Sequence, residues 1–114
     1  MLSELIVGAI QDKKGKKIVQ LDLRNIEEAS ADYFVVCEAN NPVQVRAIAE
    51  NVIREVKEQT GEIAIGKEGT TVGEWVLVDF FNVVVHVFYE PIRQVYLLED
   101  LWGDAKRKEY EDFE

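Results

Sequence analysis

The chain has 114 residues, of which 47% are apolar, and its formal net charge at pH 7 is −9. This length fits one domain, and the apolar content excludes a disordered chain. A surface this acidic repels phosphate backbones, so direct nucleic-acid binding is not expected, whereas a basic protein partner would be attracted.

The first part of the chain predicts a helix followed by two strands. Apolar residues at helical spacing follow Ser3, and this helix is expected to end by Lys14-Gly15. Strands are expected at residues 18–23 and 32–39, with a loop or a short helical turn between them. Cys37 is the only cysteine, so it cannot make an internal disulfide, and within its strand it is expected to be a small buried hydrophobe.

A long helix is the strongest local signal in the sequence. Asn40-Asn41-Pro42 supplies a cap and a proline at the first helical position. Apolar residues then recur every three or four positions as far as residue 59, and Gly61 is expected to end the helix. A short third strand is expected at residues 62–66, before a polar loop at residues 67–73.

Residues 75–80 and 83–89 predict a β-hairpin with Phe81-Asn82 as its turn. Side chains alternate between the faces of a strand. A two-residue turn therefore predicts these opposite pairs: Trp75 with Phe88, Leu77 with His86, and Asp79 with Val84. A three-residue turn would shift the pairs. One face of the hairpin is almost purely aliphatic and is expected to join the core, while the mixed face with the aromatic and polar groups is suited to another role.

A final helix is expected to open at Glu90-Pro91 and to reach Trp102. Its apolar side chains surround more of the helix than one core-facing stripe requires: Ile92, Val95, Tyr96, Leu97, Leu98, Leu101 and Trp102. Some of this apolar surface is therefore expected to be either exposed or covered by a second chain, which favours a protein-binding surface. Trp102 could instead close the core at the helix end.

Together these elements predict one α/β (α+β) domain, a mixed sheet of about five strands with helices packed on it, over residues 1–105. Residues 106–114 are charged and are expected to form a frayed or loosely helical tail. No apolar run approaches the roughly 20 residues that span a bilayer. The first residues also lack the basic region of a signal peptide, so a cytoplasmic protein is expected.

Several fragments occur in a specific order and spacing. They are Asp12 to Gly15, Leu21 to Leu23, Asp32 to Val36, Gln44 to Ala49, Glu68-Gly69, Trp75 to Asp79, Val83 to Phe88, Arg93, Tyr96 to Glu99 and Leu101 to Ala105. In this arrangement the chain resembles the ribosome silencing factor family (RsfS, also called Iojap or YbeB). The resemblance implies a nucleotidyltransferase-like α/β fold.

The same resemblance implies a function and partners. Ribosome silencing factors bind the large ribosomal subunit through ribosomal protein L-fourteen and sterically keep the small subunit from joining, which lowers translation when nutrients are short. Members can form homodimers, so a second copy would compete for the same apolar surface. The acidic composition independently fits a basic ribosomal protein as the partner.

The residues that match the family's characteristic positions are Trp75, Leu77, Asp79, His86, Phe88, Arg93, Tyr96, Glu99, Leu101 and Trp102. The four large aromatic side chains are expected to anchor the partner, and Asp79, Glu99 and His86 to meet its basic or hydrogen-bonding groups. Arg93 could instead be structural and pair with Glu90 or Glu99. The chain departs from the family pattern at Glu38-Ala39 and at Phe81-Asn82, where a glycine is usual and where a tight turn would strain the phenylalanine.

A nucleotidyltransferase-like enzyme acting on a nucleotide is the alternative. Such an enzyme holds divalent metal between carboxylates on alternate residues of one strand, whereas Gln20 and Asp22 offer only one acid. No glycine-rich loop has the spacing of a phosphate-binding motif. His86 could act as a general base, but a lone strand histidine is more often a packed structural group. We therefore expect no catalysis, no metal and no cofactor.

Overall fold

The computed structural model describes residues 2–112. The elements follow in the order α1 (Leu2–Asp12), β1 (Lys16–Asp22), β2 (Tyr33–Ala39), α2 (Pro42–Thr60), β3 (Gly66–Glu68), β4 (Trp75–Asp79), β5 (Val83–Tyr89), α3 (Glu90–Tyr96), α4 (Leu98–Leu101) and β6 (Lys106–Glu109). The strands of this described chain form one sheet in the order β3-β4-β5-β2-β1-β6. Only β2 and β5 pair in parallel, so the expected α+β fold with a mixed sheet is confirmed.

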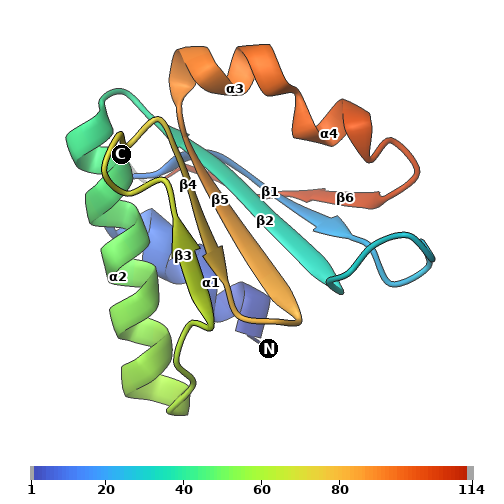
Figure 1. Cartoon of the computed structure of the whole chain (residues 1–114), viewed down its shortest axis with the longest axis horizontal. Helices are drawn as coiled ribbons and strands as arrows, with labels where there is room; N and C mark the ends of the chain where they lie inside the picture. The colour runs from blue at the N-terminus through green and yellow to red at the C-terminus, as the bar shows by residue number, and fades with distance from the viewer. Residues whose placement is uncertain (1, 113–114) are drawn as a thin grey trace.

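The two long helices cover one face of the sheet (Figure 1). Asn41 caps α2 by accepting the N–H of Gln44 at 2.9 Å, and Gly61 ends the helix in the left-handed region at φ 79°. The core lies between these helices and the aliphatic face of the strands. Cys37 is fully buried there, and burial raises the pKa of its thiol to about 12, so it is the inert hydrophobe that the sequence predicts.

The predicted hairpin register is confirmed. Trp75 lies opposite Phe88 and Leu77 opposite His86. The turn keeps only two residues, with Phe81 at φ 72°, a left-handed conformation that strains a side chain with a Cβ. Hydrogen bonds hold this turn: among them, the Asp79 carboxylate accepts the N–H of Phe81 at 2.7 Å, and the carbonyl of Asn82 accepts the N–H of Asp32 at 2.8 Å.

The third strand and the final helix differ from the expected elements. The third strand lies at Gly66–Glu68 rather than at 62–66, where it pairs with the outer edge of β4. The final helix is divided at Leu97, whose backbone is left-handed at φ 35°. This change of direction packs Leu98 against Val36 and Phe88 on the sheet.

The expectation of a frayed or loosely helical tail is wrong for residues 106–109. They form β6 on the edge of β1, although all four side chains are exposed. Pairing at a sheet edge is made by backbone groups and needs no apolar side chain, and charged residues are typical of edge strands. β6 raises the strand number of the described sheet from the expected five to six. No helix within residues 2–112 combines the length and apolarity that crossing a bilayer requires.

Candidate functional site

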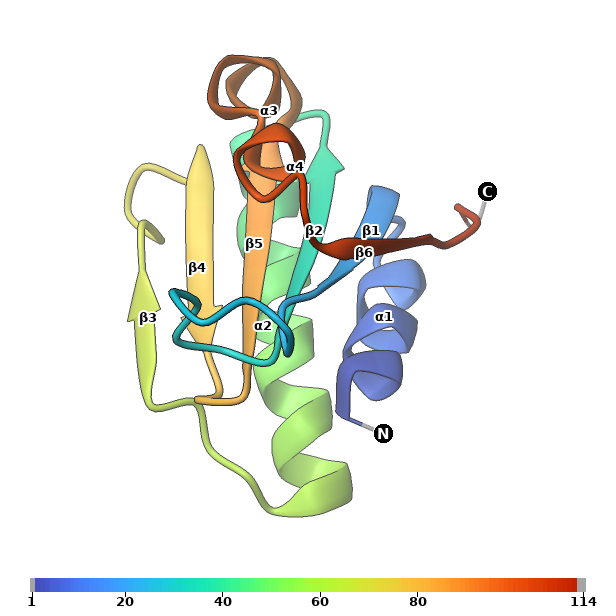
Figure 2. The same cartoon turned by 90° about the vertical axis from the view of Figure 1, so that its right-hand side faces the viewer.

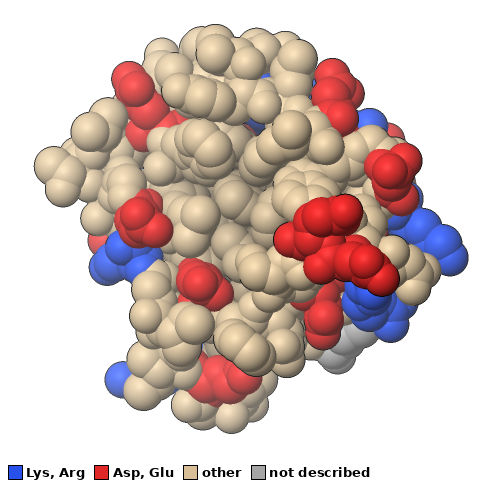
Figure 3. Space-filling model, turned by 45° about the vertical axis from the view of Figure 1, so that its right-hand side comes forward, with Lys and Arg blue, Asp and Glu red and all other residues tan. Residues whose placement is uncertain are grey.

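The second face of the sheet is only partly covered. Helices α3 and α4 lie across one end of it, and the loop between β1 and β2 passes over the other end (Figure 2). The side chains that β4, β5 and β2 direct to this side, which we call the open face, are Trp75, Leu77, Asp79, Val84, His86, Phe88, Phe34, Val36 and Glu38. Seen obliquely, this side of the molecule has a broad uncharged area with acidic groups at several places around it (Figure 3).

Trp75 is the centre of an aromatic group on the open face. Its ring stacks on Phe88 with centroids 4.9 Å apart, and Tyr96 of α3 packs on it at the same centroid distance. The indole Nε1–H donates a hydrogen bond to Nδ1 of His86 at 3.1 Å. Phe88 is fully buried and supports the aromatic group from below. Trp75 is half-buried, so part of its ring is exposed on the open face.

His86 is a buried member of this group, with 4% of its surface exposed. Burial lowers the pKa of the imidazole from 6.5 to about 4, so the ring is neutral at physiological pH. Because Nδ1 accepts from a donor-only indole, the ring proton sits on Nε2. Within residues 2–112 that Nε2 has no hydrogen-bond partner.

Phe34 on β2 completes the group, and sequence reasoning missed it. Its ring contacts His86 edge to face at a centroid distance of 4.6 Å and Trp102 at 5.8 Å. The alternation of the second strand places Phe34 and Val36 on one face, but only the parallel pairing of β2 with β5 brings them beside the hairpin. Trp102 is half-buried against Phe34, as a side chain at the rim of the open face would be.

A second apolar surface lies on the outer side of the two short helices. Its exposed residues, which we call the α3–α4 ridge, are Val95, Tyr96, Leu97 and Leu101. Leu101 is 73% exposed. The apolar pattern of the predicted helix is over-wide because the sheet does not cover these side chains. Tyr96 also contacts Trp75 and thereby connects the ridge to the open face.

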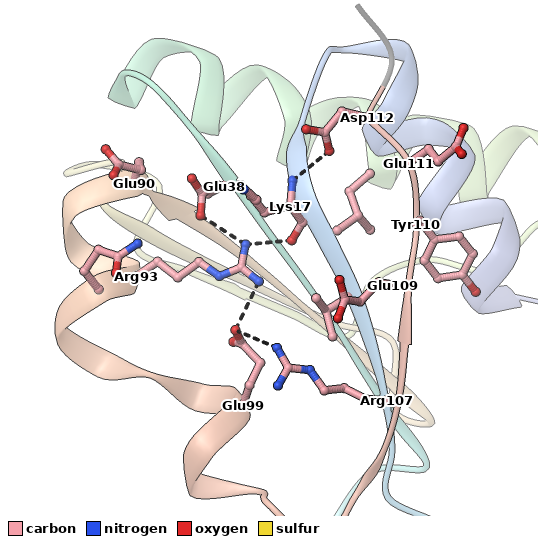
Figure 4. A pocket seen from close by; sticks show the side chains of 13 residues that line it. Lys17, Glu38, Glu90, Arg93, Glu99, Arg107, Glu109, Tyr110, Glu111 and Asp112 are labelled. Atoms are coloured by element: carbon pink, nitrogen blue, oxygen red, sulfur yellow. Dashed lines mark hydrogen bonds and ion pairs between the residues drawn. The ribbon is translucent and has the colours of Figure 1, made fainter.

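Arg93 lies behind this surface in a network of ion pairs (Figure 4). The guanidinium is bound to Glu38 and Glu99, each at 3.2 Å, and donates to the backbone carbonyl of Lys17 at 2.7 Å. Arg93 is buried, and of the two expected carboxylates it pairs with Glu99. Burial raises the pKa of Glu38 against the opposing effect of Arg93.

The two acidic residues among the expected site residues, Glu99 and Asp79, lie in different places. Glu99 is occupied by Arg93 and also lies 3.9 Å from Arg107, so its carboxylate faces the protein's own cations. Asp79 caps the hairpin turn at the end of β4 away from Trp75. The structure thus brings together the aromatic residues with Leu77 and His86, and places Asp79, Arg93 and Glu99 around them.

The carboxylates of the sheet do not form a metal centre in the described part of the chain, where no group of three potential ligands lies together. Asp22, the one acid at the position considered for nucleotidyl transfer, is bound to Arg24 at 2.8 Å, and this hydrogen bond lowers the pKa of Asp22. Gln20 beside it is buried.

Comparison with known proteins assigns this chain to a family. The family model described as "Ribosomal silencing factor during starvation" matches residues 2–114, and the chain belongs to this ribosomal silencing factor (RsfS) family. Relatives named "Ribosomal silencing factor RsfS" are 43% identical in Halalkalibacterium halodurans, over 96% of this chain and 92% of the relative, and 45% identical in Bacillus subtilis, over 90% and 85%.

Solved structures agree with the sequence comparison. A crystal structure of a Chromobacterium violaceum protein matches with a TM-score of 0.85 and 39% identity, over 90% of this chain and 83% of that chain. A crystal structure from Bacillus halodurans matches with a TM-score of 0.79 and 40% identity, over 89% and 92%. The resemblance expected from the sequence is therefore confirmed.

Proposed function

We propose that this protein acts in the cytoplasm as a ribosome silencing factor that binds the large ribosomal subunit through ribosomal protein L-fourteen. Bound there, it sterically blocks joining of the small subunit and lowers translation when nutrients are limiting. Family membership supports the silencing role. The observation that carries the binding proposal is the broad uncharged area on the side of the open face, with the exposed α3–α4 ridge beside it.

The chemistry of this surface supports a protein partner. Trp75 and Tyr96 are of the residue types enriched at interface hot spots, and both belong to one aromatic group whose inner side is already packed. Burying exposed apolar area contributes roughly 25 cal/mol per Å² before the costs of association. The net charge of −9 complements a basic ribosomal protein and disfavours contact with RNA phosphates.

We assign the contacts with the partner to Trp75, Leu77, Tyr96, Leu101 and Trp102. Phe88, His86, Arg93 and Glu99 hold these residues in place, and Asp79 maintains the hairpin turn at the edge of the face. The mechanism needs no bond making, cofactor or metal, because occupying the surface where the subunits meet is sufficient. A second copy of the chain that covered the same apolar residues would compete with the ribosome.

The test is co-sedimentation of the tagged protein with purified large subunits on sucrose gradients, together with the yield of joined ribosomes after small subunits are added. A matched pair of variants locates the surface. Leu101→Asp places a charge on the α3–α4 ridge, whereas Ile63→Asp does the same at a residue of similar exposure, 68%, after α2.

We expect the wild type and Ile63→Asp to co-sediment and to reduce subunit joining. Leu101→Asp is expected to bind at least tenfold more weakly, because a buried unpaired charge replaces an apolar contact. Unchanged subunit joining at saturating wild-type protein would refute the proposed function. Equal effects of the two variants would refute the assigned surface.

A further inference from the structure

The hydrogen bond between Trp75 and His86 constrains the exposed tryptophan in a way that the other contacts do not. The ring contacts with Phe88 and Tyr96 act on the faces of the indole. Such contacts are largely kept when the ring is turned over by 180° about the Cβ–Cγ bond, because the ring then lies in nearly the same plane. The χ2 torsion of tryptophan, which describes this rotation, is broad and roughly two-fold. A flipped indole would keep much of this stacking while moving Nε1 to the other side.

Among the contacts of Trp75 within residues 2–112, the hydrogen bond to Nδ1 of His86 is the directional one that distinguishes the two ring orientations. The acceptor lies on the neighbouring strand, diagonal to Trp75, because Leu77 is the residue directly opposite His86. His86 itself is held by burial and by its edge-to-face contact with Phe34 at 4.6 Å. The direction of the hydrogen bond is therefore set by a part of the sheet that does not move with Trp75.

The buried imidazole has an unfavourable feature that packing alone does not explain. Its Nε2–H has no acceptor among residues 2–112, and a buried unpaired donor is destabilising. A phenylalanine would fill this aromatic site without that donor. The remaining function of the imidazole is the acceptor at Nδ1, and its single partner in the described chain is the half-buried indole of Trp75.

We propose that His86 is a positioning residue for partner binding: its Nδ1 acceptor selects the ring orientation in which Trp75 meets the partner. This inference rests on the proposed function, because it concerns the same open face. It differs from a contact role for His86, since the imidazole is buried under Phe34 and Trp75 and acts through the indole.

The test uses two substitutions at one position in the full chain. His86→Phe keeps an aromatic ring and removes the acceptor. His86→Asn loses the ring but keeps an oxygen that can accept the indole N–H. Val85→Ala is the control, because this neighbouring residue is buried on the helix-covered side and its truncation destabilises the fold without touching Trp75.

We expect His86→Phe to weaken binding to purified large subunits by roughly fivefold, the equivalent of one ordinary hydrogen bond. His86→Asn is expected to restore most of this affinity, and folded Val85→Ala to bind as the wild type does. In NMR spectra of the free protein, the Trp75 indole N–H should exchange slowly with solvent in the wild type and in His86→Asn, and rapidly in His86→Phe.

The possible results separate the inference from the proposed function. Wild-type affinity in His86→Phe overturns the positioning role and leaves the proposed function intact. Equal weakening in His86→Phe and His86→Asn assigns the effect to ring packing and also overturns the role. If His86→Phe does not fold, fast exchange of the Trp75 indole in the wild type still refutes it. Absence of large-subunit binding by the wild type overturns both.

Discussion

Arg93 of α3 donates a hydrogen bond to the backbone carbonyl of Lys17 in β1 at 2.7 Å, although 76 positions separate them in the chain. The same guanidinium binds Glu38 on β2 and Glu99 on α4. One side chain thereby connects both short helices to the sheet. The position of the α3–α4 ridge relative to the open face depends on this connection.

Removing the Arg93 guanidinium should strongly destabilise the protein. Arg93→Met would leave the mostly buried carboxylate of Glu38 without its cation and would leave Glu99 with the more distant Arg107 at 3.9 Å. Breaking a buried ion pair costs about 3–5 kcal/mol. Arg24→Met is the control, because its ion pair with Asp22 is at the surface, where solvent screens the charges and the pair contributes little to stability. The free energy of unfolding in urea measures both, and similar losses in the two variants would contradict the assigned role.

The stability of the protein should decrease as the pH falls from about 6.5 to about 4 because of His86. Its pKa is lowered by burial, so the unfolded chain takes up a proton in this range while the folded chain does not. The contribution is fully present above pH 6.5, and its loss amounts to at most about 3 kcal/mol at low pH.

The comparison with His86→Phe isolates this effect. Glu38 has a pKa raised by burial, so its protonation favours the folded state as the pH falls and acts with the opposite sign. Glu38 is present in both proteins, and the difference between their urea stabilities from pH 7 to pH 4.5 therefore reports on His86. Parallel curves for the wild type and the variant would show that the imidazole titrates normally.

Replacing the turn residue Phe81 by glycine should relieve backbone strain in the hairpin turn. Its φ of 72° is unfavourable by about 1–2 kcal/mol for a residue with a Cβ, and its side chain is 69% exposed. Phe81→Gly removes this strain but gains chain entropy in the unfolded state, which costs about 0.5–1 kcal/mol. Phe81→Ala keeps the Cβ, so thermal unfolding should show Phe81→Gly as the more stable of the two. The reverse order would mean that the turn is not strained.

Truncation of the two aromatic residues in contact should separate stability from binding. Tyr96 is exposed, whereas Trp75 is half-buried between Tyr96 and Phe88 and bonded to His86. Trp75→Ala should lower the free energy of unfolding by about 2 kcal/mol, within the range typical of single substitutions, and Tyr96→Ala by less than about 1 kcal/mol. Both should reduce large-subunit binding by tenfold or more. Normal binding by folded Tyr96→Ala would exclude it from the interface.

The sequence by itself determined the elements whose signals are local. The cap and stripe of α2, the alternation of the hairpin strands and the register of Trp75 with Phe88 all follow from neighbouring residues, because period and turn length define which side chains share a face. The over-wide apolar pattern of residues 92–102 likewise predicts a surface that the sheet does not cover, which is the α3–α4 ridge. These features identified the hairpin and the last helix as the region of the candidate site.

Tertiary structure alone decided what depends on contacts distant in the chain. Phe34 enters the site because β2 pairs in parallel with β5, and the charged residues 106–109 form a strand because the edge of β1 is free to pair. Leu97 ends α3 without a glycine because Leu98 packs on the sheet and Glu99 reaches Arg93. The interactions that stabilise these features are not local. Each forms between backbone groups or side chains that are far apart in the sequence, so the pattern of neighbouring residues does not predict it.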